Sequence, residues 1–142
     1  SAAYGYDNIE IPRSEVPAAA VETASFYAPG LVFTRYAYED EDGIRIYEFE
    51  CHDYNGRHIE LDVLADGSLQ EIEYEITWDD VPISVQLEMN LESSDFIPKV
   101  IEASVRPDGV FVYEFEGTVY GEFTDIEIMD TGSAIRFSQA IN

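Results

Sequence analysis

Two histidines and two glutamates stand in a pattern suited to holding a metal ion. Strand-like runs at 44–53 and 57–64 alternate apolar and polar residues. Side chains alternate between the two faces of a strand, so placing both apolar sets on one side fixes which residues lie opposite each other. This register sets the histidines opposite each other and the glutamates opposite each other. Imidazole and carboxylate groups so arranged are ligands for zinc or another borderline metal. The predicted ligands are His52, His58, Glu50 and Glu60.

A metal site is the less favoured interpretation of this hairpin, because zinc needs a tetrahedral geometry that a flat sheet face seldom provides. At the matching positions of a later hairpin the chain has Thr118 and Phe123, so the pattern does not recur. The segment EDEDG at 39–43 resembles the start of a calcium loop, but Ile44 and Arg45 take the next positions and break the motif. We expect a hairpin turn there and leave open weak binding of a divalent cation.

The same alternation predicts an acidic outer face on the sheet. In the run 44–53, Tyr47 and Phe49 share the core face, while Glu48 and Glu50 share the other. Like charges directly opposite each other destabilise a sheet by about 0.2–1 kcal/mol per pair, which a basic partner or a cation would offset. The alternative is a solvated surface whose repulsion is screened by salt. The predicted partner-binding residues are Glu48, Glu50, Glu60, Asp62, Glu71, Glu73 and Glu75, with Glu114, Glu116, Asp125 and Glu127 as a second patch.

Turn chemistry supports this register in two hairpins. The hairpin of 44–53 and 57–64 needs a loop with an odd number of residues, in which Gly56 supplies a positive φ. The hairpin of 110–119 and 122–129 needs a two-residue loop at Tyr120-Gly121. The predicted pairs are Phe49 with Leu61, Cys51 with Ile59, Phe115 with Ile126, Glu116 with Asp125, and Glu114 with Glu127.

These hairpins belong to an order of elements that occurs twice. The sequence IYEFE at 46–50 returns as VYEFE at 112–116, and each copy follows an Asp-Gly pair. Markers in the same order at a nearly constant offset indicate an internal duplication with a unit of about 65 residues. One predicted helix precedes each set of strand-like runs. These runs are 31–39, 44–53, 57–64 and 69–77, then 99–106, 110–119, 122–129 and 133–138.

The segment 81–93 carries conflicting signals. Ile83, Val85 and Leu87 alternate with polar residues, which favours a strand. The matching part of the first unit is rich in alanine and has a helical pattern, and Pro82 suits the first turn of a helix. We therefore predict a helix at 81–93.

The arrangement resembles tandem PepSY-like repeats. The resemblance rests on helices opening with Val-Pro, a proline near the helix end, and an Asp-Gly hairpin leading into a Tyr-Glu-Phe strand, over about residues 12–138. It implies a likeness to the β-lactamase inhibitor protein fold, in which a concave sheet faces a partner. It also implies a periplasmic or secreted protein that is not an enzyme and that binds or inhibits peptidases or other proteins.

The predicted fold class is α+β, with two tandem repeats, each a helix packed on a four-stranded antiparallel sheet. The predicted divisions are an N-terminal lead-in at 1–11, a first repeat at 12–76 and a second repeat at 77–142, with the repeats forming one compact domain.

Composition narrows the function classes. Thirty acidic residues against seven lysines and arginines give a net charge of −23, which repels nucleic acid and anionic membranes and attracts cations and basic proteins. No apolar run approaches the roughly 20 residues needed to cross a bilayer. A single cysteine, Cys51, forms no intramolecular disulfide. The opening Ser-Ala-Ala is consistent with a processed secretory start, or equally with an arbitrary boundary.

The sequence predicts a non-enzymatic binding or inhibitor-like protein that presents its acidic sheet face to a basic protein or peptide. No catalytic signature accompanies the two histidines, so we predict neither an enzyme nor a cofactor. The first alternative is a metal- or cation-binding module that uses His52, His58 and neighbouring carboxylates. The second is a structural domain with no specific ligand.

Overall fold

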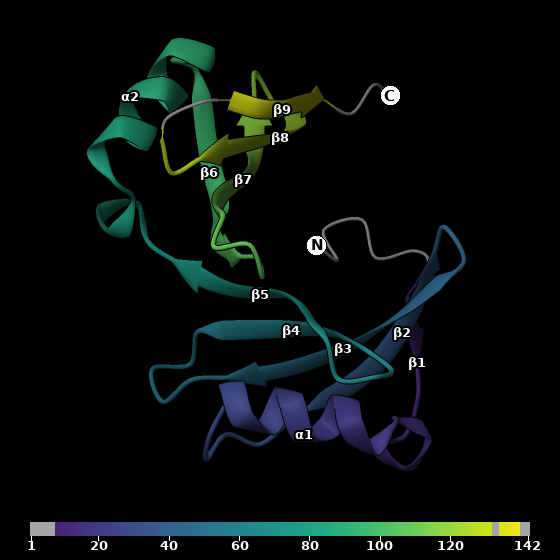
Figure 1. Ribbon diagram of the computed structural model, residues 1–142. Helices are drawn as coiled ribbons and strands as arrows, with labels where there is room; N and C mark the ends of the chain where they lie inside the picture. Colours follow the sequence, from purple (N-terminus) through teal and green to yellow (C-terminus); the bar gives the residue numbers. More distant parts are fainter. Residues whose placement is uncertain (1–7, 132–133, 140–142) are drawn as a thin grey trace. The chain divides into compact units, whose positions relative to one another are not determined.

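The computed structural model describes residues 8–131 and 134–139, which form a mostly β fold with two α-helices (Figure 1). The helices are α1 (Ala18–Tyr27) and α2 (Ile83–Glu92), and short 3₁₀ turns lie at Arg13–Glu15 and Trp78–Asp80. The strands are β1 (Ile9–Glu10), β2 (Arg35–Glu41), β3 (Ile44–His52), β4 (His58–Leu64), β5 (Leu69–Ile76), β6 (Phe96–Val105), β7 (Phe111–Val119), β8 (Glu122–Met129) and β9 (Ala134–Gln139).

The strands of the described chain follow one another from β1 to β9 across a single sheet, in chain order. The predicted fold class, two repeats that each pack a helix on a four-stranded sheet, is therefore wrong. A sheet that ended after four strands would leave the backbone groups of its last strand unpaired at an edge. Here the sheet continues from β4 through β5 to β6, so it does not end where the first repeat was predicted to end. The internal duplication stays a prediction.

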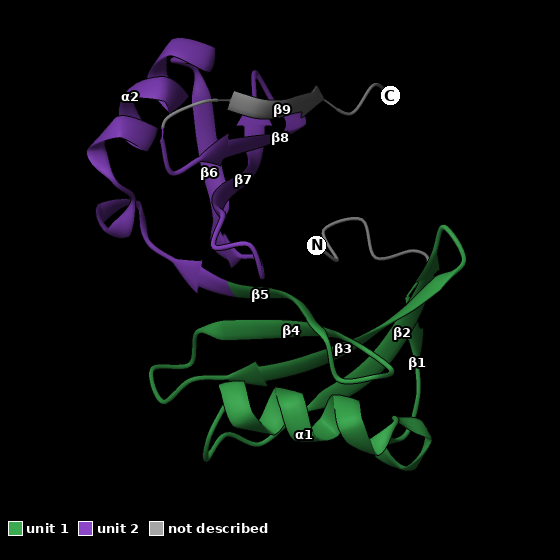
Figure 2. Ribbon diagram, in the orientation of Figure 1, with its two compact units in different colours: residues 1–73 green, residues 74–142 purple. Residues whose placement is uncertain are grey.

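The chain divides into two compact units, residues 1–73 and 74–142, and the boundary falls inside β5 (Figure 2). Within the first unit β1, β2, β3 and β4 pair antiparallel in sequence, and within the second β6, β7, β8 and β9 do the same. The predicted domain divisions at 1–11, 12–76 and 77–142 stay a prediction.

The core of the first unit forms between α1 and the apolar face of its strands. Ala20 and Ala24 are fully buried on α1 and belong to one apolar cluster with Phe49 of β3 and Leu61 of β4. Small alanine side chains let the helix backbone approach the aromatic ring closely. The β4–β5 turn is held to the helix as well, because the Thr23 hydroxyl donates a 2.7 Å hydrogen bond to the Gly67 carbonyl.

The core of the second unit explains why 81–93 is a helix despite its alternating pattern. Val85 and Met89 stand four residues apart, lie on one face of α2, and are buried in a cluster with Phe115 and Ile126. Every second apolar residue thus packs inward, and the others point outward. The predicted helix is confirmed over Ile83–Glu92.

The predicted hairpin registers are confirmed. Phe49 lies opposite Leu61 and Cys51 opposite Ile59 in the first unit, as Phe115 lies opposite Ile126 in the second. Gly56 has a φ of +78°, and the two-residue turn uses positive φ at both Tyr120 and Gly121. The pattern of apolar residues and the turn residues together set these strand pairs.

Candidate functional site

The predicted cross-strand pairs place the acidic side chains of the first unit side by side. Glu48 of β3 lies opposite Asp62 of β4, and Glu50 lies opposite Glu60. In the second unit, the structure likewise sets Glu114 opposite Glu127 and Glu116 opposite Asp125. Sequence reasoning therefore located these carboxylates correctly along the strands.

Their exposure differs from the expectation of a solvated outer face. The buried side chains are Glu48, Glu60, Asp62, Glu73, Glu114, Asp125 and Glu127, and the half-buried ones are Glu50, Glu71, Glu75 and Glu116. Charged carboxylates are almost never fully buried unless they are paired or coordinate an ion, so their burial demands a compensating interaction. Binding of a basic partner through this face stays a prediction.

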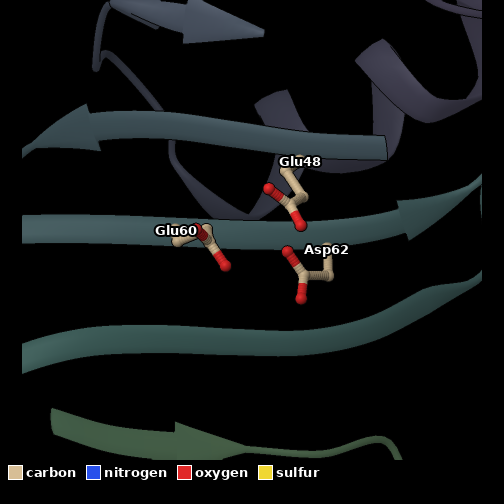
Figure 3. A group of neighbouring side chains, drawn as sticks. All are labelled: Glu48, Glu60 and Asp62. Atoms are coloured by element: carbon tan, nitrogen blue, oxygen red, sulfur yellow. The ribbon is translucent and has the colours of Figure 1, made fainter. Parts of the chain in front are cut away.

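Three of the buried carboxylates form a cluster in the first unit. Glu48 comes from β3, while Glu60 and Asp62 stand two residues apart on β4 and so share a face. One oxygen from each lies within 4.8 Å of the others, and Figure 3 shows the three side chains gathered over the two strands. The three side chains are only 2%, 3% and 6% exposed, respectively. We call Glu48, Glu60 and Asp62 the carboxylate trio.

One member of the trio is oriented by a short chain of hydrogen bonds. The Asn8 side-chain amide donates to a Glu48 carboxylate oxygen, and Arg35 Nη2 donates to Asn8 Oδ1 at 2.7 Å. The Arg35 guanidinium also lies 3.7 Å from Glu50 Oε2. Asn8 and Arg35 therefore position Glu48, and Arg35 places its charge beside Glu50.

The trio is electrostatically strained. Burial, followed by the neighbouring Glu60 charge, raises the pKa of Glu48 to about 8. Burial also raises the pKa of Glu60, although a side-chain hydrogen bond with Asp62 opposes that rise. Burial together with the Glu60 charge raises the pKa of Asp62 well above its usual range. Glu60 Oε2 and Asp62 Oδ1 are buried and have no hydrogen-bond partner among the described residues. A proton or a cation would relieve both the repulsion and the unsatisfied oxygens.

The histidines are adjacent but are not part of the trio. The His52 and His58 rings meet edge to face with centroids 5.5 Å apart, and His58 Nε2 lies 3.5 Å from Glu50 Oε1. Among the described residues, the groups of three or more side chains with ligand atoms close enough to share an ion contain only carboxylates. Metal binding by His52, His58, Glu50 and Glu60 stays a prediction.

Sequence reasoning missed the trio as a site of its own. The cross-strand pair Glu48 and Asp62, with Glu60 two residues before Asp62, was visible in the register. Alternation assigns side chains to a face, but it does not indicate whether that face is covered, so the three carboxylates were grouped with the rest of an exposed patch.

The acidic turn at 39–43 is a hairpin turn, as predicted. Asp42 and Gly43 both have positive φ, at 52° and 79°. Arg45 donates to both Asp40 carboxylate oxygens at 2.8 and 3.0 Å, and its guanidinium lies 3.9 Å from the Tyr38 ring centroid. Asp40 thus has its partner within the hairpin.

A second feature, on α2 in the second unit, is apolar and exposed. Ile83, Leu87 and Leu91 are 69%, 58% and 81% exposed. They stand four residues apart, so they form one continuous stripe along the helix. We call these three residues the α2 stripe.

A hollow of about 290 Å³ lies near the same helix, lined by Trp78, Met89, Asn90, Ser93, Phe96 and Pro98. The Trp78 ring packs edge-on against Phe115 with centroids 6.1 Å apart, so one side of the indole is fixed by the core. The single tryptophan therefore serves the core of the second unit and lines the hollow at once.

Comparisons with known structures define the class of fold. A proposed periplasmic protein from Bacteroides eggerthii DSM 20697 is 15% identical, with a TM-score of 0.72 over 87% of this chain and 88% of that one. A DUF2874 family protein from Bacteroides uniformis ATCC 8492 is 16% identical, with a TM-score of 0.71 over 87% and 89%.

A BLIP-like protein from Bacteroides fragilis NCTC 9343, named for its likeness to the β-lactamase inhibitor protein, is 15% identical. Its TM-score is 0.69 over 93% of this chain and 89% of that one. The fold of this chain is thus BLIP-like, as the sequence resemblance implied, while its PepSY-like part stays a prediction. No family model matches the chain, and no curated protein matches it in sequence.

Neither α-helix of the described residues has the length and apolar character needed to cross a membrane.

Proposed function

We propose that this protein is a non-enzymatic periplasmic binding protein that docks a basic protein or peptide on the α2 stripe. The observation that carries the proposal is the exposure of Ile83, Leu87 and Leu91 along one face of a helix whose opposite face is buried. Contiguous exposed apolar surface on a soluble domain is characteristic of interaction sites, whereas single exposed apolar residues need no explanation.

The negative charge of the chain favours a basic partner. Glu88 and Glu92 directly follow Leu87 and Leu91 in α2, and the whole chain carries −23. A second copy of this chain would bring the same negative charge to the contact and be repelled. A partner that presents apolar side chains flanked by lysine or arginine would gain from both parts of the surface.

The acidic sheet face contributes to the same attraction. Glu50, Glu71, Glu75 and Glu116 are half-buried and keep part of their surface in water. Their charges add to the negative potential that draws a basic partner toward the protein. The buried carboxylates of that face are less suited to direct contact with a protein partner, since a contacting side chain must first reach them.

The fold supports the assignment of class and location. Structures of similar fold include a BLIP-like protein and a proposed periplasmic protein. This similarity supports a periplasmic location and a binding role rather than an enzymatic one. Fold alone does not fix function, so the proposal rests on the α2 stripe and its charges.

The test uses a defined probe, a fluorescent amphipathic helix with leucine on one face and lysine on the other. Fluorescence anisotropy compares the wild type with Leu87→Ser/Leu91→Ser. We expect the stripe variant to bind at least about tenfold more weakly, because it loses two central apolar contacts and a loss of about 1.4 kcal/mol in binding free energy is a factor of ten in affinity. Circular dichroism establishes that each variant is folded.

The matched control is Val32→Ser/Ile44→Ser, which removes two exposed aliphatic side chains from the first unit (78% and 53% exposed). It should bind the peptide as the wild type does. A glutamate analogue of the peptide should not bind. Equal binding by the stripe variant and the control, or failure of the lysine peptide to bind wild type, overturns the proposal.

A further inference from the structure

We propose that the carboxylate trio, Glu48, Glu60 and Asp62, is a binding site for a hard divalent cation, with calcium as the preferred ion. The site lies on β3 and β4 of the first unit and is distinct from the α2 stripe, so it goes beyond the proposed function.

The spacing of the trio fits one shared ion. Calcium is held by oxygen ligands at about 2.3–2.6 Å, so two ligands of the same ion lie at most about 5 Å apart. The trio brings one oxygen from each carboxylate within 4.8 Å of the other two. These oxygens can therefore surround one ion without rearrangement of the strands that carry them.

Unsatisfied oxygens point to a ligand independently of the spacing. Glu60 Oε2 and Asp62 Oδ1 are buried without a hydrogen-bond partner among the described residues, and the parent side chains are 3% and 6% exposed. Figure 3 shows the carboxyl groups of Glu48 and Asp62 turned toward each other across the strands, with Glu60 beside them. A buried oxygen left without a hydrogen-bond partner is unfavourable, and more so if it is charged. A coordinated cation would satisfy both oxygens together.

The donor set favours calcium over zinc. All three side chains offer oxygen, which hard cations prefer, whereas zinc sites combine any carboxylate ligands with cysteine or histidine. Asp62 also belongs to a second close group with Glu71 and Glu73 of β5, so more carboxylate oxygens lie within one strand of the trio. Calcium accepts six to eight oxygens in a flexible arrangement, while magnesium demands a near-ideal octahedron.

The raised pKa values of the trio agree with this assignment. Burial and mutual repulsion disfavour three negative charges at this place in the absence of an ion. A bound ion of charge +2 makes the charged form of these carboxylates favourable, because their attraction to the ion then outweighs their repulsion of one another.

Isothermal titration calorimetry tests the site, with calcium chloride and magnesium chloride added to chelator-treated protein. We expect one calcium to bind per wild-type chain, and magnesium to bind more weakly. Glu60→Gln/Asp62→Asn keeps the shape of both side chains and removes two of three charged ligands. It should weaken calcium binding by about 100-fold or more, because affinity follows the number of charged ligands. Glu48→Gln is a milder substitution should the double variant fail to fold.

Two control variants separate the trio from other carboxylates and from the histidines. Glu41→Gln/Asp42→Asn removes the same charge from an exposed turn, and His52→Ala/His58→Ala removes both imidazoles. Both should bind calcium as the wild type does. The proposal is overturned by absence of calcium binding to folded wild type at millimolar calcium, by tighter binding of magnesium, or by unchanged affinity in the trio variants. None of these outcomes bears on peptide binding at the α2 stripe.

Discussion

Glu48 of β3 lies directly opposite Asp62 of β4, and the two carboxylates are 2% and 6% exposed. A cross-strand pair of like charges is unfavourable even at a surface. Here the pair is buried, with Glu60 two residues away on β4, so we expect this part of the sheet to respond to protons and cations more strongly than a solvated acidic face would.

Stability without a cation should fall as pH rises. The folded protein raises the pKa of Glu48 from 4.5 to about 8, and the unfolded chain has the ordinary value. Between these two pKa values the folded state binds more protons than the unfolded state. The contribution of protonated Glu48 to the free energy of unfolding is therefore fully present below about pH 4.5 and is lost as the pH rises to about 8. Urea denaturation in EDTA from pH 5 to 8.5 measures it.

Glu48→Gln is the control for this pH dependence, because it cannot titrate. Its stability should vary less with pH than that of the wild type across the same range. A wild-type stability that rises steadily from pH 5 to 8 would contradict the assignment of raised pKa values to the trio.

The two faces of α2 should differ sharply in their contribution to stability. Met89 is buried in the core of the second unit, whereas Leu91 is 81% exposed. Met89→Ala should lower the free energy of unfolding by about 2–5 kcal/mol through lost burial and the cavity left behind. Leu91→Ala should change it by less than about 0.5 kcal/mol. Chemical denaturation of both variants measures the difference, and similar losses would mean that the helix faces are misassigned.

Gly117 of β7 should not tolerate a side chain. A Cβ at this position would lie 2.0 Å from the Ile97 carbonyl oxygen, next to the register shift between Pro98 and Val100. Gly117→Ala must therefore displace the β6 backbone, and we expect a loss of about 2 kcal/mol or more. Gly109→Ala is the comparison, because space is open there and only its φ of +80° is strained. In thermal unfolding, Gly117→Ala should have a much lower melting temperature than Gly109→Ala. The reverse order would refute the close approach of Gly117 to the Ile97 carbonyl oxygen.

Association with the basic peptide should depend on salt through the charges beside the α2 stripe. Glu88→Lys/Glu92→Lys reverses two charges on α2 and keeps Ile83, Leu87 and Leu91. Stopped-flow association should be slower for this variant, and its rate should fall less steeply with ionic strength than that of the wild type. Equal rates and equal salt slopes would leave the net charge as a contribution to solubility alone.

The sequence determined most of the local structure. Alternation and turn residues predicted that Phe49 pairs with Leu61 and that Gly56 takes a positive φ, because a shift of one residue would move every apolar side chain off the core face. The helix at α2 was predicted against its alternating pattern, and burial of Val85 and Met89 on one face is what stabilises it. Short sequence motifs also predicted the likeness to the β-lactamase inhibitor protein fold.

Only the tertiary structure decided two larger matters. The strand order across one continuous sheet depends on hydrogen bonds between segments distant in sequence. The alternation of residues in β5 is the same whether that strand lies at the edge of a sheet or in its middle. Glu48, Glu60 and Asp62 are likewise buried only in the folded sheet, where Asn8, 40 residues before Glu48, donates a hydrogen bond to the Glu48 carboxylate. Alternation assigns a side chain to a face of the strand, whereas long-range packing determines whether that face meets water, and this difference turned an expected acidic surface into a buried carboxylate trio.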